Sequence, residues 1–321
     1  MARYLVTGGA GFIGSHIAER LVRDGHAVRV LDDLSSGRLE NLAPVRASIE
    51  LVEGDIRDRP ALQQALRGIE YVIHEAGWRS VPKSMTDPAG YTEVNVLGTV
   101  RVLEEAKAAG VRRVVLASSS SVYGNSQRLP LTEAQPPAPI SPYALSKWYG
   151  EQFCQLFSRR FGLETVSLRY FNVFWPRQSL DNEYAVVVPK LITCLLQAEP
   201  PPIYGDGLQS RDFTFIENVV TGTIRASVAP GVSGGVFNIA CGDTHSILDL
   251  LQALDQLLGT ELAPLHRPAR AGDVRRTMAD ISQARRALQW EPTVGFVEGL
   301  RQTVAWFQSQ HHARTVSRSA G

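Results

Sequence analysis

The chain has 321 residues, of which 44% are hydrophobic and 20% are charged, as in a globular protein of one or two domains. Its 33 Lys and Arg residues balance 32 Asp and Glu residues, which argues against a nucleic-acid-binding or membrane-surface protein. The sequence has no apolar run of membrane-spanning length, and its three cysteines form no C-x-x-C pair, so we expect a cytoplasmic protein without disulfides or a bound metal.

A short strand, a glycine-rich turn and a helix begin the chain. The turn has the pattern Gly8-x-x-Gly11-x-x-Gly14, in which backbone N–H groups and the positive end of a helix can face a phosphate. The second predicted strand is followed by Asp32, where an acidic side chain can bind the hydroxyl groups of a ribose. Together these features favour a nucleotide site over a plain structural turn.

Strands and helices alternate from there to about residue 168, with short loops between them. The strands are expected at residues 2–7, 27–31, 49–53, 71–74, 113–117 and 164–168, and the later helices at residues 60–66, 87–109 and 142–161. This alternation predicts an α/β fold of the Rossmann type, with a doubly wound parallel sheet. Ligands bind at the carboxyl ends of the strands in such sheets, so the site should lie where these strands end.

The pattern changes after about residue 170, where predicted strands are shorter and prolines and glycines are more frequent. Five helices are expected there, at residues 185–198, 217–228, 246–258, 281–288 and 295–308. We predict a dinucleotide-binding domain over residues 1–174 and a smaller α/β substrate domain over residues 175–310, with residues 211–241 crossing back to the first. The tail, residues 311–321, lacks apolar periodicity and is expected to be flexible.

Tyr143 and Lys147 are four residues apart on a predicted helix, so they lie on one face of it. An ammonium group near a phenol favours the phenolate and lowers the pKa of the tyrosine, which makes Tyr143 a candidate general base and acid. Such a pair alone is common on exposed helices. Its association with the glycine turn and with the hydroxyl groups of residues 118–121, which end the fifth strand, favours a catalytic site.

These motifs, in this order and spacing, resemble those of the extended short-chain dehydrogenase/reductases. The resemblance is carried by the glycine turn, by Asp32, and by residues 118–124 (SSSSVYG), 141–147 (SPYALSK) and 168–173 (LRYFNV). More narrowly, about residues 2–310 look like the NAD-dependent nucleotide-sugar 4-epimerases. The motifs are specific in combination, although each alone is not.

The resemblance implies an enzyme that uses NAD to invert C4 of a UDP-sugar. Hydride passes from C4 to the cofactor while Tyr143 takes the proton of the 4-hydroxyl group, and both return after the 4-keto sugar has turned over. Lys147 would also hold the nicotinamide ribose, and Ser119, with Ser120, would hydrogen-bond the O4 oxygen. The family's 4,6-dehydratases have an Asp-Glu pair where this chain has Ser120 and Ser121, which argues against dehydration.

The family's binding residues are carried over by position. Those expected at the cofactor are Gly8, Gly11, Phe12, Ile13, Gly14, Asp32, Asp55, Ile56, Ala76, Gly77, Arg79 and Asn95, together with Tyr143 and Lys147. Those expected at the substrate are Ser80, Ser119, Ser120, Tyr143, Asn172, Val188, Tyr204, Arg211, Arg270, Asp273 and Thr277. Asp55 could instead cap a turn, and Arg79 could be a solvated charge. Glu75 and Trp175 depart from the family pattern, in which an uncharged residue and a glycine are usual.

Position 277 is expected to select the sugar. In the family a tyrosine there crowds the 2-position of the sugar, whereas Thr277 leaves room for an acetamido group. Residues 80–84 and 184–190 also look most like those of epimerases that prefer N-acetylated UDP-hexoses. The resemblance therefore predicts interconversion of UDP-GlcNAc and UDP-GalNAc, with UDP-Glc and UDP-Gal also accepted.

Two other functions remain open from the sequence. A UDP-uronate 4-epimerase or decarboxylase would need a partner for the sugar carboxylate, and Arg275, Arg276 or Lys83 could serve. A non-catalytic NAD-binding regulator would be expected to lack some of the catalytic residues, yet all three are present. By resemblance we also expect a homodimer, in which the helices matching 88–109 and 142–161 pair between two copies.

Overall fold

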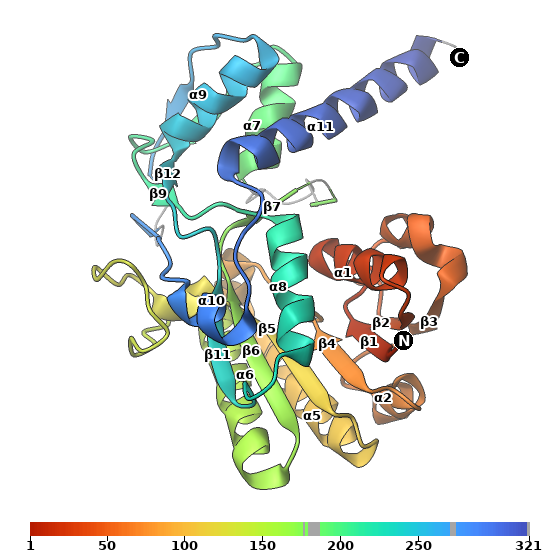
Figure 1. The fold of residues 1–321 in the computed structure, drawn as a ribbon. Helices are drawn as coiled ribbons and strands as arrows, with labels where there is room; N and C mark the ends of the chain where they lie inside the picture. The colour runs from red at the N-terminus through yellow and green to blue at the C-terminus, as the bar shows by residue number, and fades with distance from the viewer. Residues whose placement is uncertain (176, 179–186, 270–273, 320–321) are drawn as a thin grey trace.

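A seven-stranded parallel sheet forms the larger part of the molecule (Figure 1). The structure is a computed structural model, and it describes residues 1–175, 177–178, 187–269 and 274–319. Across the sheet the strand order is β11-β6-β5-β4-β1-β2-β3. The strands are β1 (Arg3–Thr7), β2 (Ala27–Asp32), β3 (Ile49–Glu53), β4 (Tyr71–His74), β5 (Arg113–Ser119), β6 (Glu164–Tyr170) and β11 (Gly235–Ile239). The predicted α/β fold with a doubly wound parallel sheet is confirmed.

Helices cover both faces of this sheet. One face carries α2 (Arg59–Leu66), α5 (Gly98–Ala108) and α6 (Pro142–Leu156), and the other carries α1 (Phe12–Arg23), α8 (Ile216–Val228) and α10 (Ser282–Leu288). Successive residues of a strand point to opposite faces. Leu5 of β1 accordingly packs in the cluster with α2 and α5, whereas Tyr4 and Val6 pack in the cluster with α1. This is why the strands read as continuous apolar runs.

The two long helices of the first domain begin at capped prolines. Asp87 accepts a hydrogen bond from the N–H group of Gly90 at the start of α4 (Pro88–Tyr91), and a π-helical stretch (Thr92–Leu97) connects α4 to α5. Ser141 caps α6 in the same way, accepting from the N–H group of Ala144. A π-helical turn (Phe157–Phe161) extends α6, so the helices expected at 87–109 and 142–161 are both present. A short α3 (Val81–Thr86) and 3-10 turns at Leu39–Ser48 were not predicted.

Residues 216–239 lie with the large sheet although they follow the start of the second part of the chain. Helix α8 packs on β4, β5 and β6, and β11 pairs in parallel with β6 along its whole length. The sequence did not identify β11 as a strand, because a five-residue segment between glycines shows too little periodicity.

The remaining elements form a smaller unit beyond the carboxyl ends of the strands (Figure 1). Its helices are α7 (Val187–Leu196), α9 (Ile247–Leu258) and α11 (Phe296–Ser319). They share one apolar core, to which they contribute Leu191, Leu250 and Leu300, respectively. Its strands are short pairs: β7 (Val173–Phe174) with β10 (Thr214–Phe215), β8 (Pro202–Tyr204) with β13 (Leu265–Arg267), and β9 (Ser210–Arg211) with β12 (His245–Ser246). Helix α11 runs on to Ser319, through most of the segment for which we expected a flexible tail.

No helix in the described part of the chain is long and apolar enough to cross a membrane. Cys154, Cys194 and Cys241 are all free thiols, and the first two are buried. The described residues contain no group of three or more His, Cys, Asp or Glu side chains that could hold a metal ion.

Candidate active site

The glycine turn joins β1 to α1 in a conformation that side chains would prevent. Gly8 has a φ of +67°, and a Cβ atom there would lie 2.6 Å from the backbone nitrogen of Ala76. A Cβ atom on Gly14 would lie 2.3 Å from the carbonyl oxygen of Gly8. Helix α1 begins after Gly11 without a side-chain cap, so its first N–H groups have no side-chain acceptor there. The turn therefore has the backbone geometry of a phosphate site.

Asp32, at the end of β2, is buried and holds the glycine turn in place. Its Oδ2 atom accepts a hydrogen bond of 2.8 Å from the N–H group of Ala10, and its Oδ1 atom accepts one of 2.9 Å from that of Leu34. Burial raises the pKa of this carboxyl group, and the two backbone N–H groups oppose the shift. Each oxygen keeps a further lone pair, so the side chain can still accept from ribose hydroxyl groups.

Asp55 and Ile56 follow β3 but differ in what they contact. Asp55 accepts hydrogen bonds from both the backbone and the guanidinium group of Arg57, with an ion-pair distance of 2.6 Å, and this arginine lowers the pKa of the carboxyl group. The carboxylate therefore closes a turn, as the alternative interpretation had it. Ile56 is buried, and its Cδ1 atom lies so close to Gly98 that a Cβ atom there would be at 2.6 Å.

His74, which sequence reasoning missed, connects the end of β1 to helix α5. Thr7 Oγ1 lies 2.7 Å from Nδ1 of His74, and Thr99 Oγ1 lies 3.0 Å from Nε2. Because the Thr99 hydroxyl donates to the carbonyl group of Asn95, it accepts from Nε2–H, and Nδ1 accepts from Thr7. Burial lowers the pKa of His74 to about 3, so the ring is neutral at pH 7. The signal in the sequence is a His that ends an otherwise apolar strand, Tyr71–His74.

Asn95 fixes the segment that follows β4. Its Oδ1 atom accepts from the N–H group of Trp78 at 2.7 Å, and its Nδ2 atom donates to Trp78 O and to Ser146 Oγ, both at 2.9 Å. A Cβ atom on Gly77 would lie 3.0 Å from this Oδ1 atom. Asn95 thus supports the site through the backbone, holding residues 76–79 against α6.

Tyr143 and Ser119 meet at the carboxyl end of β5. Ser119 is the last residue of β5, Tyr143 lies in the first turn of α6, and the hydroxyl group of Ser119 acts on the phenol of Tyr143. The pKa of Tyr143 is raised and not lowered as predicted, because burial outweighs the hydroxyl group of Ser119 and the positive charge of Arg79, which both lower it. A phenol whose ionised form is favoured by a hydroxyl group and a positive charge can exchange a proton with a substrate hydroxyl group.

Lys147 differs from the prediction in its contacts. Its Nζ atom donates to the carbonyl oxygen of Ala117 at 2.9 Å, and Glu75 is the negative charge that acts on it. Burial lowers the pKa of Lys147, and Glu75 opposes this shift. The helix does place Lys147 on the same side as Tyr143, but the strongest favourable effects on the pKa of Tyr143 come from Ser119 and Arg79. The long lysine side chain reaches the backbone of β5, two residues before the strand ends.

Asp212 joins three segments of the second unit beside Thr277. Its buried carboxylate accepts hydrogen bonds of 2.9 to 3.1 Å from the N–H groups of Cys241, Gly242 and Ala279, and burial raises its pKa to about 7. Thr277 accepts from the N–H group of Asp212 at 3.3 Å and is itself buried. These contacts bring position 277 next to the strand that ends in Arg211.

A family model described as the NAD dependent epimerase/dehydratase family matches residues 4–240. The chain belongs to this family. The glycine turn in which added Cβ atoms would collide, the uncapped start of α1, and Asp32 together fit a bound dinucleotide. NAD is the cofactor.

Individual relatives cover nearly the whole chain, but their names contain different sugars. A UDP-glucose 4-epimerase of Mycolicibacterium smegmatis is 40% identical over 96% of this chain and 99% of its own length. A UDP-glucuronate 4-epimerase of Thermodesulfobacterium geofontis is 34% identical over 95% of this chain and 96% of its own. The solved UDP-N-acetylglucosamine 4-epimerase of Methanobrevibacter ruminantium, in complex with UDP-N-acetylmuramic acid, has a TM-score of 0.92 at 37% identity, covering 96% and 99%.

The chain is therefore an enzyme. Its type is that of its relatives, the NAD-dependent UDP-sugar 4-epimerases. The reading as a non-catalytic regulator is not supported. Because the relatives carry three different sugar names, similarity alone does not select the sugar.

The other predicted substrate residues lie at several places in this epimerase fold. Ser120 begins the turn after β5, and the exposed Asn172 lies between β6 and β7. Ser80 caps α3, and its backbone exchanges hydrogen bonds with the hydroxyl group of Tyr91. Tyr204 ends β8. Arg270 and Asp273 lie outside the described residues.

Val188 does not agree with its predicted role. Its side chain is completely buried in the apolar cluster that joins α7 to α9, so it has no surface for a substrate to touch. The helical register explains this, because Val188 and Leu191 lie on the same inward face of α7.

Trp175, which stands where a glycine is usual in the family, packs against two other aromatic rings. Its ring makes edge contacts with Phe215 and with His16 of α1, at centroid distances of 4.7 and 6.5 Å. Two residues further on, Arg177 forms an ion pair of 2.9 Å with Glu19 of the same helix. The segment after β7 thus packs along α1, the helix that follows the glycine turn.

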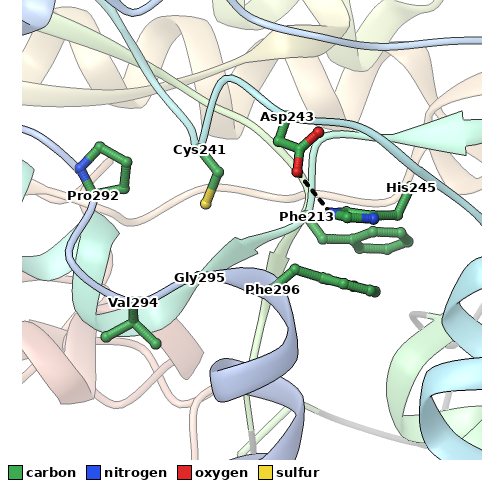
Figure 2. Close-up of a pocket in the computed structure, with 8 residues that line it drawn as sticks. All are labelled: Phe213, Cys241, Asp243, His245, Pro292, Val294, Gly295 and Phe296. Atoms are coloured by element: carbon green, nitrogen blue, oxygen red, sulfur yellow. Dashed lines mark ion pairs between the residues drawn. The ribbon is translucent and has the colours of Figure 1, made fainter.

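A separate cavity of about 210 Å³ is lined by Phe213, which follows Asp212, and by Cys241, whose N–H group donates to Asp212 (Figure 2). Its walls are mostly apolar, and His245 stacks on Phe296 with a centroid distance of 3.9 Å while pairing with Asp243 at 3.1 Å. None of the residues that line it was predicted at the cofactor or the substrate. It is therefore distinct from the site built around Tyr143.

Proposed function

We propose that the enzyme interconverts UDP-GlcNAc and UDP-GalNAc, and also UDP-Glc and UDP-Gal, by inverting C4 through a 4-keto sugar. The observation that carries the choice of sugar is Thr277. The hydroxyl group of Thr277 accepts a hydrogen bond from the N–H group of Asp212, next to the segment with Arg211. This bond holds the small side chain in one place. A tyrosine at this position would add a ring where an acetamido group has to be placed.

Tyr143 exchanges the proton of the sugar's 4-hydroxyl group in this proposal, and Ser119 hydrogen-bonds the same oxygen. The effect of the Ser119 hydroxyl group on the pKa of Tyr143 supports these roles, because it requires the two side chains to be neighbours. Arg79 stabilises the phenolate. When bound, NAD supplies the hydride acceptor for C4. The glycine turn and Asp32 would hold its phosphates and its adenosine ribose.

The UDP part of the substrate is assigned to the smaller unit, residues 175–310. Arg211 is the proposed diphosphate ligand, because a guanidinium group matches phosphate oxygens in a bidentate way. Its backbone lies in β9, paired with β12, which fixes its place in the fold. Arg270 and Asp273 are proposed for the second phosphate contact and the uridine ribose, from their positions in the sequence alone.

The uronate alternative has less support from the side-chain contacts. Arg275 makes two hydrogen bonds of 2.8 Å with the carboxylate of Asp206, so its charge already has a partner. Lys83 and Arg276 are both exposed, and the backbone of Arg276 forms an isolated β-bridge with that of Ser210. A sugar carboxylate would have to break the Arg275 pair or recruit one of the other two cations.

Product analysis with UDP-GlcNAc, UDP-Glc and UDP-GlcA in parallel tests this proposal. We expect turnover of the first two and none of the third. Tyr143→Phe should abolish turnover while the protein still contains NAD, which separates a lost base from a lost cofactor. Turnover of UDP-Glc alone, or of UDP-GlcA, would refute the proposed sugar.

A homodimer is also proposed, because apolar side chains are exposed on neighbouring helices. Five apolar side chains, each at least 36% exposed, lie on α6 and on the two π-helical segments, one before α5 and one after α6: Leu97, Leu145, Tyr149, Leu156 and Phe161. A second copy of this face would cover them. Light scattering of the purified protein checks this, and a monomer at micromolar concentration would contradict it.

The three free cysteines support a reducing, cytoplasmic setting.

A further inference from the structure

Tyr91 binds the loop that follows β4 through its hydroxyl group. It is the last residue of α4, and only 3% of its surface is exposed. The hydroxyl group accepts a hydrogen bond of 2.9 Å from the N–H group of Ser80 and donates one of 2.7 Å to the carbonyl oxygen of the same residue. One phenol therefore occupies both backbone polar groups of Ser80, which fixes the peptide units on either side of it.

Asn95 binds the backbone of Trp78, two residues earlier in the loop, in the same manner. It lies four residues after Tyr91, and its side-chain amide accepts from the N–H group of Trp78 at 2.7 Å and donates to the carbonyl oxygen at 2.9 Å. In a sheet, a neighbouring strand pairs with both backbone groups of every second residue in this way. Side chains from α4 and from the π-helical stretch after it thus take the place of a neighbouring strand along residues 78–80.

The ring of Tyr91 lies between this loop and the catalytic helix. Its centroid is 5.3 Å from that of the Trp78 ring and 6.5 Å from that of the Tyr143 ring, with interplanar angles of 73° and 86°. Both are edge contacts at distances where aromatic pairs attract each other. The hydroxyl end of Tyr91 therefore holds Ser80 while its ring contacts the proposed general base, so one side chain connects the two.

The side chain of Ser80 has a hydroxyl proton available for a ligand. Its Oγ atom accepts a hydrogen bond of 3.3 Å from the N–H group of Lys83 at the start of α3, and it donates to no acceptor among the described residues. The side chain is half-buried, so a bound molecule can reach it. A hydroxyl group in this state can donate to an oxygen atom of a sugar.

We propose that Tyr91 is a positioning residue for the sugar, which holds residues 78–80 in their binding conformation before the substrate arrives. This rests on the proposed function, in which Ser80 contacts the sugar and Tyr143 exchanges its proton. Without the hydroxyl group of Tyr91, the backbone of Ser80 would bind water in several loop conformations, and the sugar would have to select one of them. The loss falls on binding of the sugar, because the ring still supports Tyr143 during the reaction.

Tyr91→Phe tests the proposal, because it removes the hydroxyl group and keeps the ring. The KM for UDP-GlcNAc should rise about five- to tenfold, as for the loss of one or two hydrogen bonds, while kcat stays within about twofold of the wild-type value. Titration calorimetry should show the same loss of affinity for UDP-GlcNAc and none for UDP, which is assigned to the smaller unit. Tyr91→Leu, which also removes the ring, should in addition lower kcat, by up to about tenfold.

Tyr4→Phe is the matched control. Tyr4 of β1 is buried, and its hydroxyl group lies 3.2 Å from Oγ of Ser227, in a contact that involves none of the site residues. This variant also loses a buried tyrosine hydroxyl group, so it controls for lost stability. It should leave KM and the dissociation constants of UDP and UDP-GlcNAc unchanged.

The outcomes separate this proposal from the proposed function. If Tyr91→Phe weakens the binding of UDP and UDP-GlcNAc by the same factor, lowers kcat alone or changes neither constant, Tyr91 does not position the sugar and the proposal is overturned. If the wild type turns over UDP-Glc or UDP-GlcA and not UDP-GlcNAc, the proposed sugar fails. The dissociation constants of the accepted sugar nucleotide and of UDP then still decide the role of Tyr91.

Discussion

The hydroxyl group of Ser119, at the end of β5, favours the phenolate of Tyr143 in the first turn of α6. The pair lies where a helix begins beside the carboxyl edge of the sheet, and ligands bind at this edge in this type of fold. Ser119 opposes the rise that burial causes in the pKa of Tyr143. In the proposed mechanism, proton transfer to and from the sugar depends on this pair.

Ser119→Ala should therefore impair turnover in a pH-dependent way. Loss of the donor raises the pKa of Tyr143, so the acidic limb of the kcat/KM profile should move to higher pH, and kcat should fall about 100-fold, as for loss of one acid–base partner. Steady-state kinetics from pH 6 to pH 9 measure both. Ser119→Thr, which keeps the hydroxyl group, is the matched control. An Ala variant with an unshifted acidic limb would show that Ser119 does not act on Tyr143.

Arg79→Met should shift the same limb in the same direction. The positive charge of Arg79 lowers the pKa of Tyr143, so its removal should raise the pH at which activity appears, by about half a unit to one unit. Arg79→Lys keeps the charge and should retain most of the wild-type profile. Lys83→Met, which removes an exposed cation of the neighbouring helix α3, should leave it unchanged. A shift of equal size in the Lys83 variant would mean that net charge, and not the position of Arg79, is responsible.

The sequence predicted the fold well because its signals are local. The strand–turn–helix unit at Gly8, the capped starts of the helices at Asp87 and Ser141, and the alternation of apolar segments each depend on nearby residues. The strand β11 was not identified, because its place beside β6 is fixed by pairing with a segment about 70 positions away and not by its own pattern.

The contacts within the site were harder to predict. Spacing on a helix gave the common face of Tyr143 and Lys147, but not that the lysine would bind Ala117 and face Glu75. Likewise His74 and Asp212 act through bonds to residues far away in the chain, to Thr99 and to Ala279. Val188 was assigned by position alone, and burial rules out the predicted contact. Long-range side-chain contacts depend on tertiary packing, which no short motif encodes.

Asp32→Ala should weaken both the cofactor site and the fold. The N–H groups of Ala10 and Leu34 would lose their acceptor in a buried region, which costs about 1–3 kcal/mol for each unsatisfied group. We expect a lower melting temperature and a purified protein with little bound NAD, measured by its absorbance after release. Asp33→Ala, at the exposed neighbouring position, should change neither much. A variant with full NAD content would contradict the role of Asp32 at the ribose.

Thr277→Tyr should convert the enzyme to one that prefers sugars without the acetamido group. The phenol ring would fill space beside the segment that Asp212 ties together, where the 2-substituent of the sugar is proposed to lie. We expect kcat/KM to fall at least about tenfold for UDP-GlcNAc and less than about threefold for UDP-Glc, a difference of the size that one steric contact gives. Thr277→Val, which keeps the volume and removes only the hydroxyl group, controls for the lost bond to Asp212. Equal losses on both substrates in the Tyr variant would show that position 277 does not select the sugar.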